Sequence, residues 1–135
     1  MNDQDLEPSA QLDGRRATVA PGFECWGVYS KHCATRRTLA RIADKWTILI
    51  VGRLTQRECR FGELRRSIEG ISSKVLTEHL RELEADGLLV RTVEPTSPPA
   101  VSYALTELGK SLGDVALSLK AWAEDHAEAI QKNSD

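Results

Sequence analysis

The sequence predicts a mainly α-helical fold with one small β-hairpin, an α+β arrangement, in a chain of 135 residues. Three observations carry this prediction. Beyond residue 33, apolar residues recur over most of the chain at spacings of three and four, as they do on buried helix faces. Residues 88–93 and 100–105 instead show the period of two that is typical of strands. The hydrophobic content of 41% and the charged content of 28% are ordinary for a globular protein, and no apolar run is long enough to span a bilayer.

Residues 1–22 are acidic and rich in Asp, Gln, Ser, Pro and Gly, with little periodicity. We expect a flexible tail there, followed by a single domain over residues 23–135. The tail has neither the basic start nor the apolar stretch of a secretory signal. Three cysteines cannot complete a disulfide framework, and no spacing of Cys and His predicts a zinc site. We therefore expect a cytoplasmic protein with no metal, no cofactor and no membrane partner.

The first helical pattern begins near Cys33 and gathers apolar residues into one stripe, which we interpret as core. Its members are Leu39, Ile42, Ala43, Trp46, Ile50 and Leu54. Asp44 and Gly52 interrupt the stripe, so we expect two helices or one bent helix, with the break near residues 43–45. A short helix is predicted next, over residues 61–67.

The best-marked helix is predicted over residues 74–86. Gly70 allows a tight turn before it, Ser72 and Ser73 are preferred N-cap residues, and Gly87 is a stop signal. Its inward face is expected to be apolar and consists of Leu76, Leu80 and Leu83. Its outward stripe is polar and consists of Lys74, Thr77, Glu78 and Arg81.

The predicted hairpin has residues 94–99 at its tip, where three prolines exclude the interior of a sheet. Thr106 is expected to cap a last helix over about residues 107–131. The apolar stripe of that helix is longer than one small core needs. It consists of Leu108, Leu112, Val115, Leu119, Trp122 and Ala123.

A helix, a tight turn, an amphipathic helix and a hairpin, in this order, predict a winged helix-turn-helix with its DNA-reading unit at about residues 58–105. The partner of such a unit is double-stranded DNA, with the second helix in the major groove and the hairpin, or wing, along the backbone. The net charge is −2, but residues 36–91 carry twelve basic against eight acidic side chains. No arrangement of catalytic residues is present, so we expect no enzyme.

The candidate DNA contacts are polar side chains on the second helix, on the short helix before it and on the wing. They are Arg60, Arg65, Arg66, Ser72, Ser73, Lys74, Thr77, Glu78, Arg81 and Arg91. Arg and Lys pair with guanine, and Thr contacts a thymine methyl group or a phosphate. The alternative is a winged helix that binds only proteins through its wing and long helix. Salt-dependent DNA affinity separates the two hypotheses.

Cys33 is the candidate redox sensor, because basic residues flank it and positive charge lowers the pKa of a thiol. These neighbours are Lys31, His32, Arg36 and Arg37. Cys25 and Cys59 are candidate resolving partners. The alternative is that all three cysteines are packing residues.

Three aromatic residues are candidates for a ligand pocket. Trp26 and Tyr29 either pack an N-terminal helix across a dimer or line a pocket for an aromatic inducer at the dimer interface. Trp46 lies on the inward stripe, where a core role is the alternative to a pocket role.

Five segments match, in order and spacing, those of a known family. They are Cys33, residues 44–50 (DKWTILI), 60–66 (RFGELRR), 70–88 (GISSKVLTEHLRELEADGL) and 101–109 (VSYALTELG). On these residues the stretch 33–112 resembles the HxlR-type winged helix-turn-helix transcriptional regulators of bacteria.

The resemblance implies a homodimer that binds a pseudo-palindromic operator and acts as a repressor or an activator. It also implies dimerisation through the flanking helices, which assigns to the interface Leu112, Val115, Leu119 and Trp122. Several members sense electrophiles or oxidants through the cysteine that aligns with Cys33, whereas others respond to small ligands. A small-molecule or electrophile inducer is therefore an expected partner.

Overall fold

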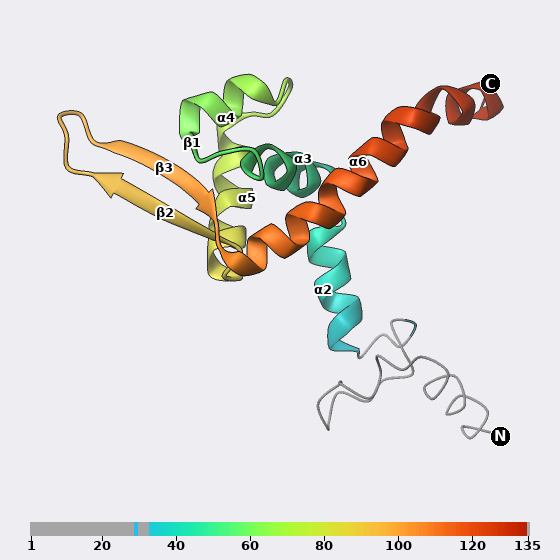
Figure 1. The fold of residues 1–135 in the computed structure, drawn as a ribbon, viewed down its shortest axis with the longest axis horizontal. Helices are drawn as coiled ribbons and strands as arrows, with labels where there is room; N and C mark the ends of the chain where they lie inside the picture. The colour runs from blue at the N-terminus through green and yellow to red at the C-terminus, as the bar shows by residue number, and fades with distance from the viewer. Residues whose placement is uncertain (1–28, 30–32, 135) are drawn as a thin grey trace. The chain divides into compact units, whose positions relative to one another are not determined.

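The structure, a computed structural model, describes residue 29 and residues 33–134 (Figure 1). The chain divides into two compact units, Met1–Asp44 and Lys45–Asp135, and each is described by itself. The predicted tail over residues 1–22 lies outside the described residues. Within the described part of the chain, no helix is long and apolar enough to cross a membrane.

The helix α2 (Ala34–Ile42) belongs to the first unit, and Cys33 is its N-cap residue. The sequence predicts Leu39 and Ala43 on a buried stripe, and this prediction is wrong. Leu39 is 48% exposed, Ala43 is exposed, and no residue of α2 is buried. The backbone leaves the helical region at Ala43, with φ −87° and ψ 60°, so the stripe does not continue along one helix.

The second unit is built around the helix α3 (Lys45–Leu54). The predicted break between two helices is confirmed, since α2 ends at Ile42 and α3 begins at Lys45. Ile50 and Val51 of α3 are completely buried. Side chains from the other helices and the sheet complete the core around them, among them Leu64, Leu76, Leu80, Leu83, Leu89, Tyr103, Leu105 and Ala116.

Two helices and a tight turn follow as predicted. The helix α4 covers Phe61–Ser67 and the helix α5 covers Ser73–Ala85. Gly70 in the turn has φ +92° and Gly87 after α5 has φ +78°, a left-handed conformation that favours glycine. Ser72 caps α5, because its Oγ accepts a hydrogen bond from the backbone N–H of Val75 at 3.1 Å.

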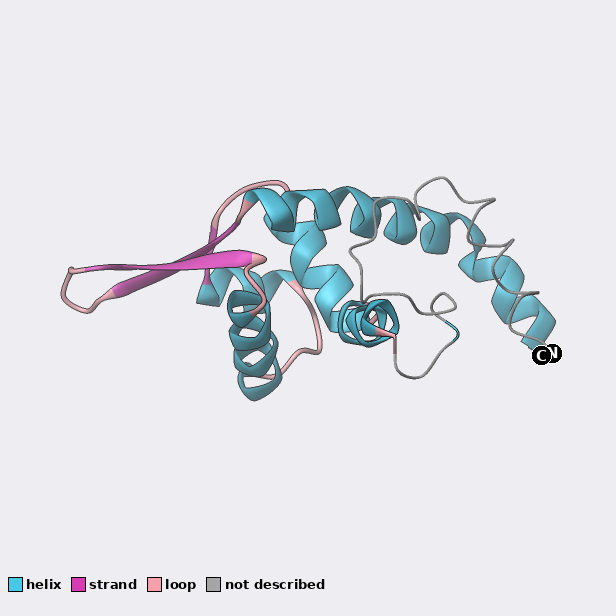
Figure 2. Ribbon diagram, turned by 90° about the horizontal axis from the view of Figure 1, so that it is seen from below, coloured by secondary structure: helices cyan, strands magenta, loops and turns pink. Residues whose placement is uncertain are grey.

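The predicted hairpin is confirmed as β2 (Leu89–Glu94) and β3 (Ala100–Leu105). A third strand, β1 (Cys59–Arg60), pairs with the other side of β3, so the antiparallel order is β1-β3-β2. The β2–β3 ribbon extends away from the helices of the second unit, as a wing does (Figures 1 and 2).

The last helix, α6 (Glu107–Ser134), is 28 residues long. Thr106 caps it, because its Oγ1 accepts a hydrogen bond from the backbone N–H of Gly109 at 3.0 Å. The C-terminal half of α6 continues beyond α3 (Figure 1).

Small residues form the inward face of α6, where Gly109, Gly113 and Ala116 are buried. A Cβ atom at Gly109 would collide with the backbone carbonyl of Leu88, so this close approach requires glycine. The predicted apolar stripe lies on a neighbouring face of the helix, where Leu112 packs against the core and Val115 is 59% exposed.

Candidate nucleic-acid interface

The outward face of α5 is polar, as the sequence predicts. Lys74, Glu78 and Arg81 are exposed and Thr77 is half-buried, whereas the three leucines of the inward face are in the core. Among the described residues, neither Lys74 nor Arg81 forms an ion pair. Both positive charges are therefore available to an external anion.

The N-terminal end of α5 adds hydroxyl groups to this face. Ser72 and Ser73 are both exposed. The Oγ of Ser72 accepts the capping hydrogen bond, which leaves its own O–H as a donor. Unpaired backbone N–H groups at a helix N-terminus attract anions such as phosphate, so this end of α5 suits a DNA backbone.

Two arginines before α4 are engaged within the chain. The Glu63 carboxylate accepts a hydrogen bond from the backbone N–H of Arg60 at 2.8 Å, and its Oε2 lies 3.3 Å from Nη2 of Arg57. The Arg60 N–H, followed by Arg57, lowers the pKa of Glu63. The Arg60 guanidinium lies 3.9 Å from the carboxylate of Glu94 on the wing. Arg60 is thus less available to DNA than Arg81.

Arg65 and Arg66 form the basic last turn of α4, and both are exposed. The Arg66 guanidinium lies over Gly62, where a Cβ atom would be 3.2 Å from its Nη1. Neither arginine forms an ion pair in the described part of the chain.

The strand register separates two of the predicted contacts. Arg91 lies opposite Tyr103, whereas Arg60 lies opposite Ser102. Directly opposed residues of an antiparallel pair point to the same face, and successive residues point to opposite faces. Because Tyr103 is buried, Arg91 shares the core-side face of the sheet and Arg60 lies on the other face.

A contact that the sequence does not predict helps to hold β1 on the wing. The Ser102 hydroxyl donates a hydrogen bond to Oε2 of Glu58 at 2.6 Å, across 44 residues of sequence. No local pattern signals this contact, because its two members meet only when β1 pairs with β3.

The cysteines differ in state. Cys33 is 1% exposed and disulfide-bonded, and the other half of that bond lies outside the described residues, as does Cys25. Cys59 is a free thiol that is 3% exposed, and burial raises its pKa. Its Sγ donates a weak hydrogen bond to the carbonyl of Arg57 at 3.5 Å. A buried, protonated thiol of this kind reacts slowly, so Cys59 is a poor resolving partner.

The candidate pocket residues are described only in part. Tyr29 is 89% exposed, and its carbonyl accepts a hydrogen bond from Nη1 of Arg36 at 3.1 Å. Trp46 packs against the core, and the Lys45 ammonium lies 4.5 Å from the centre of its ring. Trp26 lies outside the described residues. The described residues contain no group of three His, Cys, Asp or Glu side chains that could hold a metal ion.

Comparison with known proteins agrees with this geometry. The family described as HxlR-like helix-turn-helix matches residues 41–131. The HTH-type transcriptional regulator YtfH of Escherichia coli (strain K12) is 37% identical over 97 residues, which cover 72% of this chain and 77% of that protein. The solved structure of the transcriptional regulator ytfH from Salmonella typhimurium has a TM-score of 0.73 and 34% identity, and it covers 78% of this chain and 95% of that one. The redox regulator HypR in its reduced form has a TM-score of 0.66 and 37% identity, with 73% and 97% of the two chains covered.

The capped helix with an outward polar face, the turn before it and the wing beside it define a winged helix-turn-helix transcriptional regulator, whose partner is DNA. The chain belongs to the HxlR-like helix-turn-helix family.

Proposed function

We propose that this chain is a sequence-specific regulator, not an enzyme, that acts in the cytoplasm as a homodimer on a pseudo-palindromic operator. The observation that carries the proposal is the outward face of α5, where Lys74 and Arg81 have no ion pair among the described residues. Each subunit places α5 in a major groove, with its N-terminal end closest to the bases. Lys74 and Arg81 pair with guanine or phosphate, and Thr77 contacts a thymine methyl group or a phosphate.

The remaining basic and hydroxyl-bearing residues among the predicted contacts position the protein on the DNA backbone. Ser72 and Ser73 donate to phosphate at the start of α5, and Arg65 and Arg66 reach phosphates beside α4. Arg91 contacts the backbone or the minor groove from the wing. Arg60 contributes less than these residues, because the Glu94 carboxylate competes for its guanidinium.

The proposed dimer forms through the outer stripe of α6. Val115, Leu119 and Trp122 are 59%, 49% and 53% exposed, and Leu112 lies at the edge of the stripe, partly packed on the core. Monomeric proteins rarely expose a continuous apolar stripe of this length, so a second copy is the natural cover. The two-fold axis of such a dimer matches two half-sites that lie about 34 Å apart on DNA.

Control of DNA binding is proposed to act through Cys33, and HypR, a redox regulator, is similar to this chain. Cys25 is the proposed partner of Cys33, because Cys59 carries a free thiol. Two thiols lose two electrons and two protons to an oxidant as the S–S bond forms, and a dithiol reverses the step. The bond lies directly before α2, so its state changes the backbone that enters this helix.

Fluorescence anisotropy of the reduced protein on the DNA upstream of its own gene, repeated across salt concentrations, tests DNA binding. We expect tight binding whose logarithm falls linearly with the logarithm of the salt concentration, because phosphate contacts release counterions. Failure to bind this fragment and pooled genomic DNA would contradict the proposal and favour a protein-interaction module.

Two cysteine variants, Cys33→Ser and Cys59→Ser, test the proposed redox control. Diamide is expected to change the DNA affinity of the wild type and of Cys59→Ser, but not that of Cys33→Ser. An equal diamide response in Cys33→Ser would exclude Cys33 as the control point.

A further inference from the structure

A cavity of about 320 Å³ lies in the second unit between α3, the end of α4 and α6. Leu49 of α3, Ile68 directly after α4 and Leu117 of α6 provide its apolar lining. Ile68 is buried, whereas Leu117 is 38% exposed. The volume is within the range of small-molecule sites, which combine an apolar lining with a few polar groups.

Gly52 of α3 leaves room in this cavity. It lies inside a helix, where glycine is unfavourable, and its φ is not positive. A Cβ atom there would meet only Leu117 Cδ2, at 3.8 Å, which is an ordinary contact. Neither the backbone nor the packing of α6 therefore requires glycine at this position. What the missing side chain provides is open space between α3 and α6.

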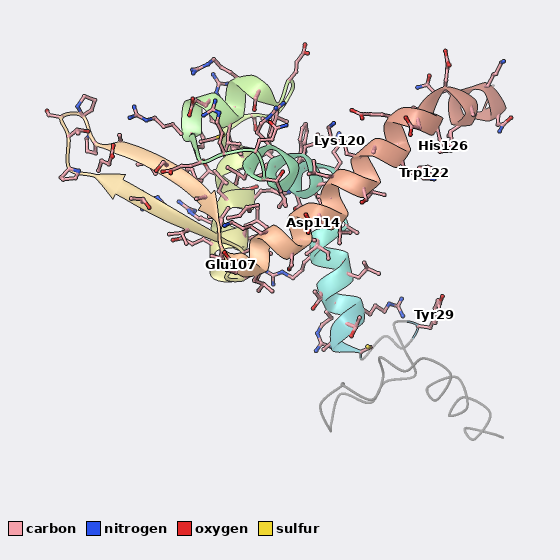
Figure 3. All side chains as sticks on the ribbon, viewed as in Figure 1. Tyr29, Glu107, Asp114, Lys120, Trp122 and His126 are labelled. Carbon is pink, nitrogen blue, oxygen red and sulfur yellow. The ribbon has the colours of Figure 1, made fainter. Side chains whose placement is uncertain are left out.

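Two cations and one carboxylate complete the lining. The Nη1 of Arg53 donates a hydrogen bond to Oε1 of Gln56 at 3.2 Å, which leaves the rest of its guanidinium available. Lys120 also lines the cavity, and its Nζ lies 2.8 Å from the Glu124 carboxylate. Figure 3 shows Lys120 on the side of α6 toward α3 and α4. The Glu124 carboxylate already balances Lys120, so Arg53 is the cation of the lining that has no ion pair among the described residues, and Glu69 is its one acidic residue.

We propose that this cavity binds a small organic monocarboxylate with an apolar body. The carboxylate pairs with the Arg53 guanidinium, because charge-assisted hydrogen bonds are stronger than neutral ones. The apolar body occupies the space beside Gly52 and contacts Leu49 and Ile68. This site differs from the candidate pocket of Trp26, Tyr29 and Trp46.

The position of the cavity gives the ligand a route to the DNA-binding helix. Ser67, Ile68 and Glu69 directly precede Gly70, where the chain turns into α5. Leu117 and Lys120 belong to α6, whose opposite side carries the proposed dimer stripe. A ligand in the cavity thus contacts both the entrance to α5 and α6. An effect on DNA affinity rests on the proposed function, whereas ligand binding itself does not.

Titration of the full chain with sodium phenylacetate, followed by ¹H–¹⁵N NMR spectra, tests the site. We expect saturable shifts at Gly52, Arg53, Ile68 and Lys120, with a Kd of about 1 mM. Phenylacetamide has the same apolar body without the charge, and it is expected to bind about tenfold more weakly. Absence of saturable shifts at these residues, or equal affinity for the amide, would overturn the proposal.

Two variants sharpen the titration. Arg53→Gln removes a surface cation and is expected to weaken phenylacetate binding about fivefold. Lys132→Gln removes a cation from the last turn of α6, outside the cavity, and is the control that is expected to bind as the wild type does. Gly52→Leu fills the cavity and is expected to abolish binding, and its amide spectrum reports whether it folds. Wild-type affinity in Arg53→Gln, or in a folded Gly52→Leu, would overturn the assignment.

The same probe is then added to the protein–DNA complex. A change in DNA affinity at saturating phenylacetate supports the regulatory step, and an unchanged affinity overturns that step alone. Phenylacetate binding by a protein that binds no DNA would overturn the proposed function and leave the ligand site supported.

Discussion

The helices α5 and α6 each bury one face in the same core, but their outer faces have opposite chemistry. α5 presents Lys74 and Arg81 to the outside, whereas α6 presents Leu119 and Trp122. A charged face without internal partners suits a polyanion, and an apolar face suits another protein surface. The comparison therefore supports the proposal that DNA binding and self-association use two separate surfaces of the second unit.

The largest effect is expected from a charge on the outer face of α6. Leu119→Glu places a carboxylate in the proposed dimer interface and is expected to weaken dimerisation at least about 100-fold, since a buried unpaired charge is costly. Sedimentation equilibrium measures this, with Ser118→Glu as the matched control. A dimer of unchanged affinity would place the interface elsewhere.

The inner face of α6 is expected to be sensitive to volume rather than to charge. Gly109→Ala forces a methyl group against the Leu88 carbonyl and is expected to destabilise the fold by about 2 kcal/mol. Gly52→Ala is the matched control, because its new Cβ atom meets only Leu117 at an ordinary distance. Thermal unfolding compares the two variants. Equal melting temperatures would contradict the close approach of α6 to the loop before β2.

A substitution on the outer face of α5 is expected to change DNA binding alone. Arg81→Ala is expected to weaken DNA binding roughly tenfold and to lower the salt slope by about 1, with no change in dimerisation. Anisotropy titrations measure both quantities, and Lys110→Ala on α6 is the control for loss of a positive charge. Equal losses in the two variants would mean that net charge, not the face of α5, determines affinity.

The smallest expected effect concerns the Glu63 carboxylate, which stabilises the start of α4. The folded-state pKa of Glu63 is lowered, so its contribution to stability is present above its unfolded pKa and is lost as pH falls through the folded pKa. We expect the stability advantage of the wild type over Glu63→Gln to disappear below about pH 4. Melting temperatures across pH measure it, with Glu128→Gln as control. An advantage that persists in acid would exclude the carboxylate as its source.

The helix α5 could be predicted from the sequence because its signals are local. Ser72, Gly70 and Gly87 mark its ends through capping and backbone conformation, and leucine spacing marks its inner face. These effects act within a few residues and need no distant partner. The residues of α5 that we assign to DNA follow from the same periodicity.

Other features needed the tertiary structure. The two residues of β1 are too few to show a period, and the strand exists because Cys59 and Arg60 pair with β3. The placement of Arg60 and Arg91 on opposite faces of the sheet follows from that register.

The face of α6 that meets α3 was also hidden in the sequence. Hydrophobicity favours the large apolar stripe as core, but Gly109, Gly113 and Ala116 are buried instead. Small residues allow two elements to approach closely, and this benefit depends on the shape of the opposing surface. Leu39 was misassigned for a related reason, since a stripe predicts burial only while its helix continues.

The sequence by itself determined the class of protein, the helix boundaries, the hairpin and the polar face of α5, because capping, glycine conformation and periodicity are local properties. Only the tertiary structure decided the third strand, the inward face of α6, the burial of the Cys59 thiol and the cavity beside Gly52. Each of these depends on which surfaces meet, and distant segments of the chain provide those surfaces.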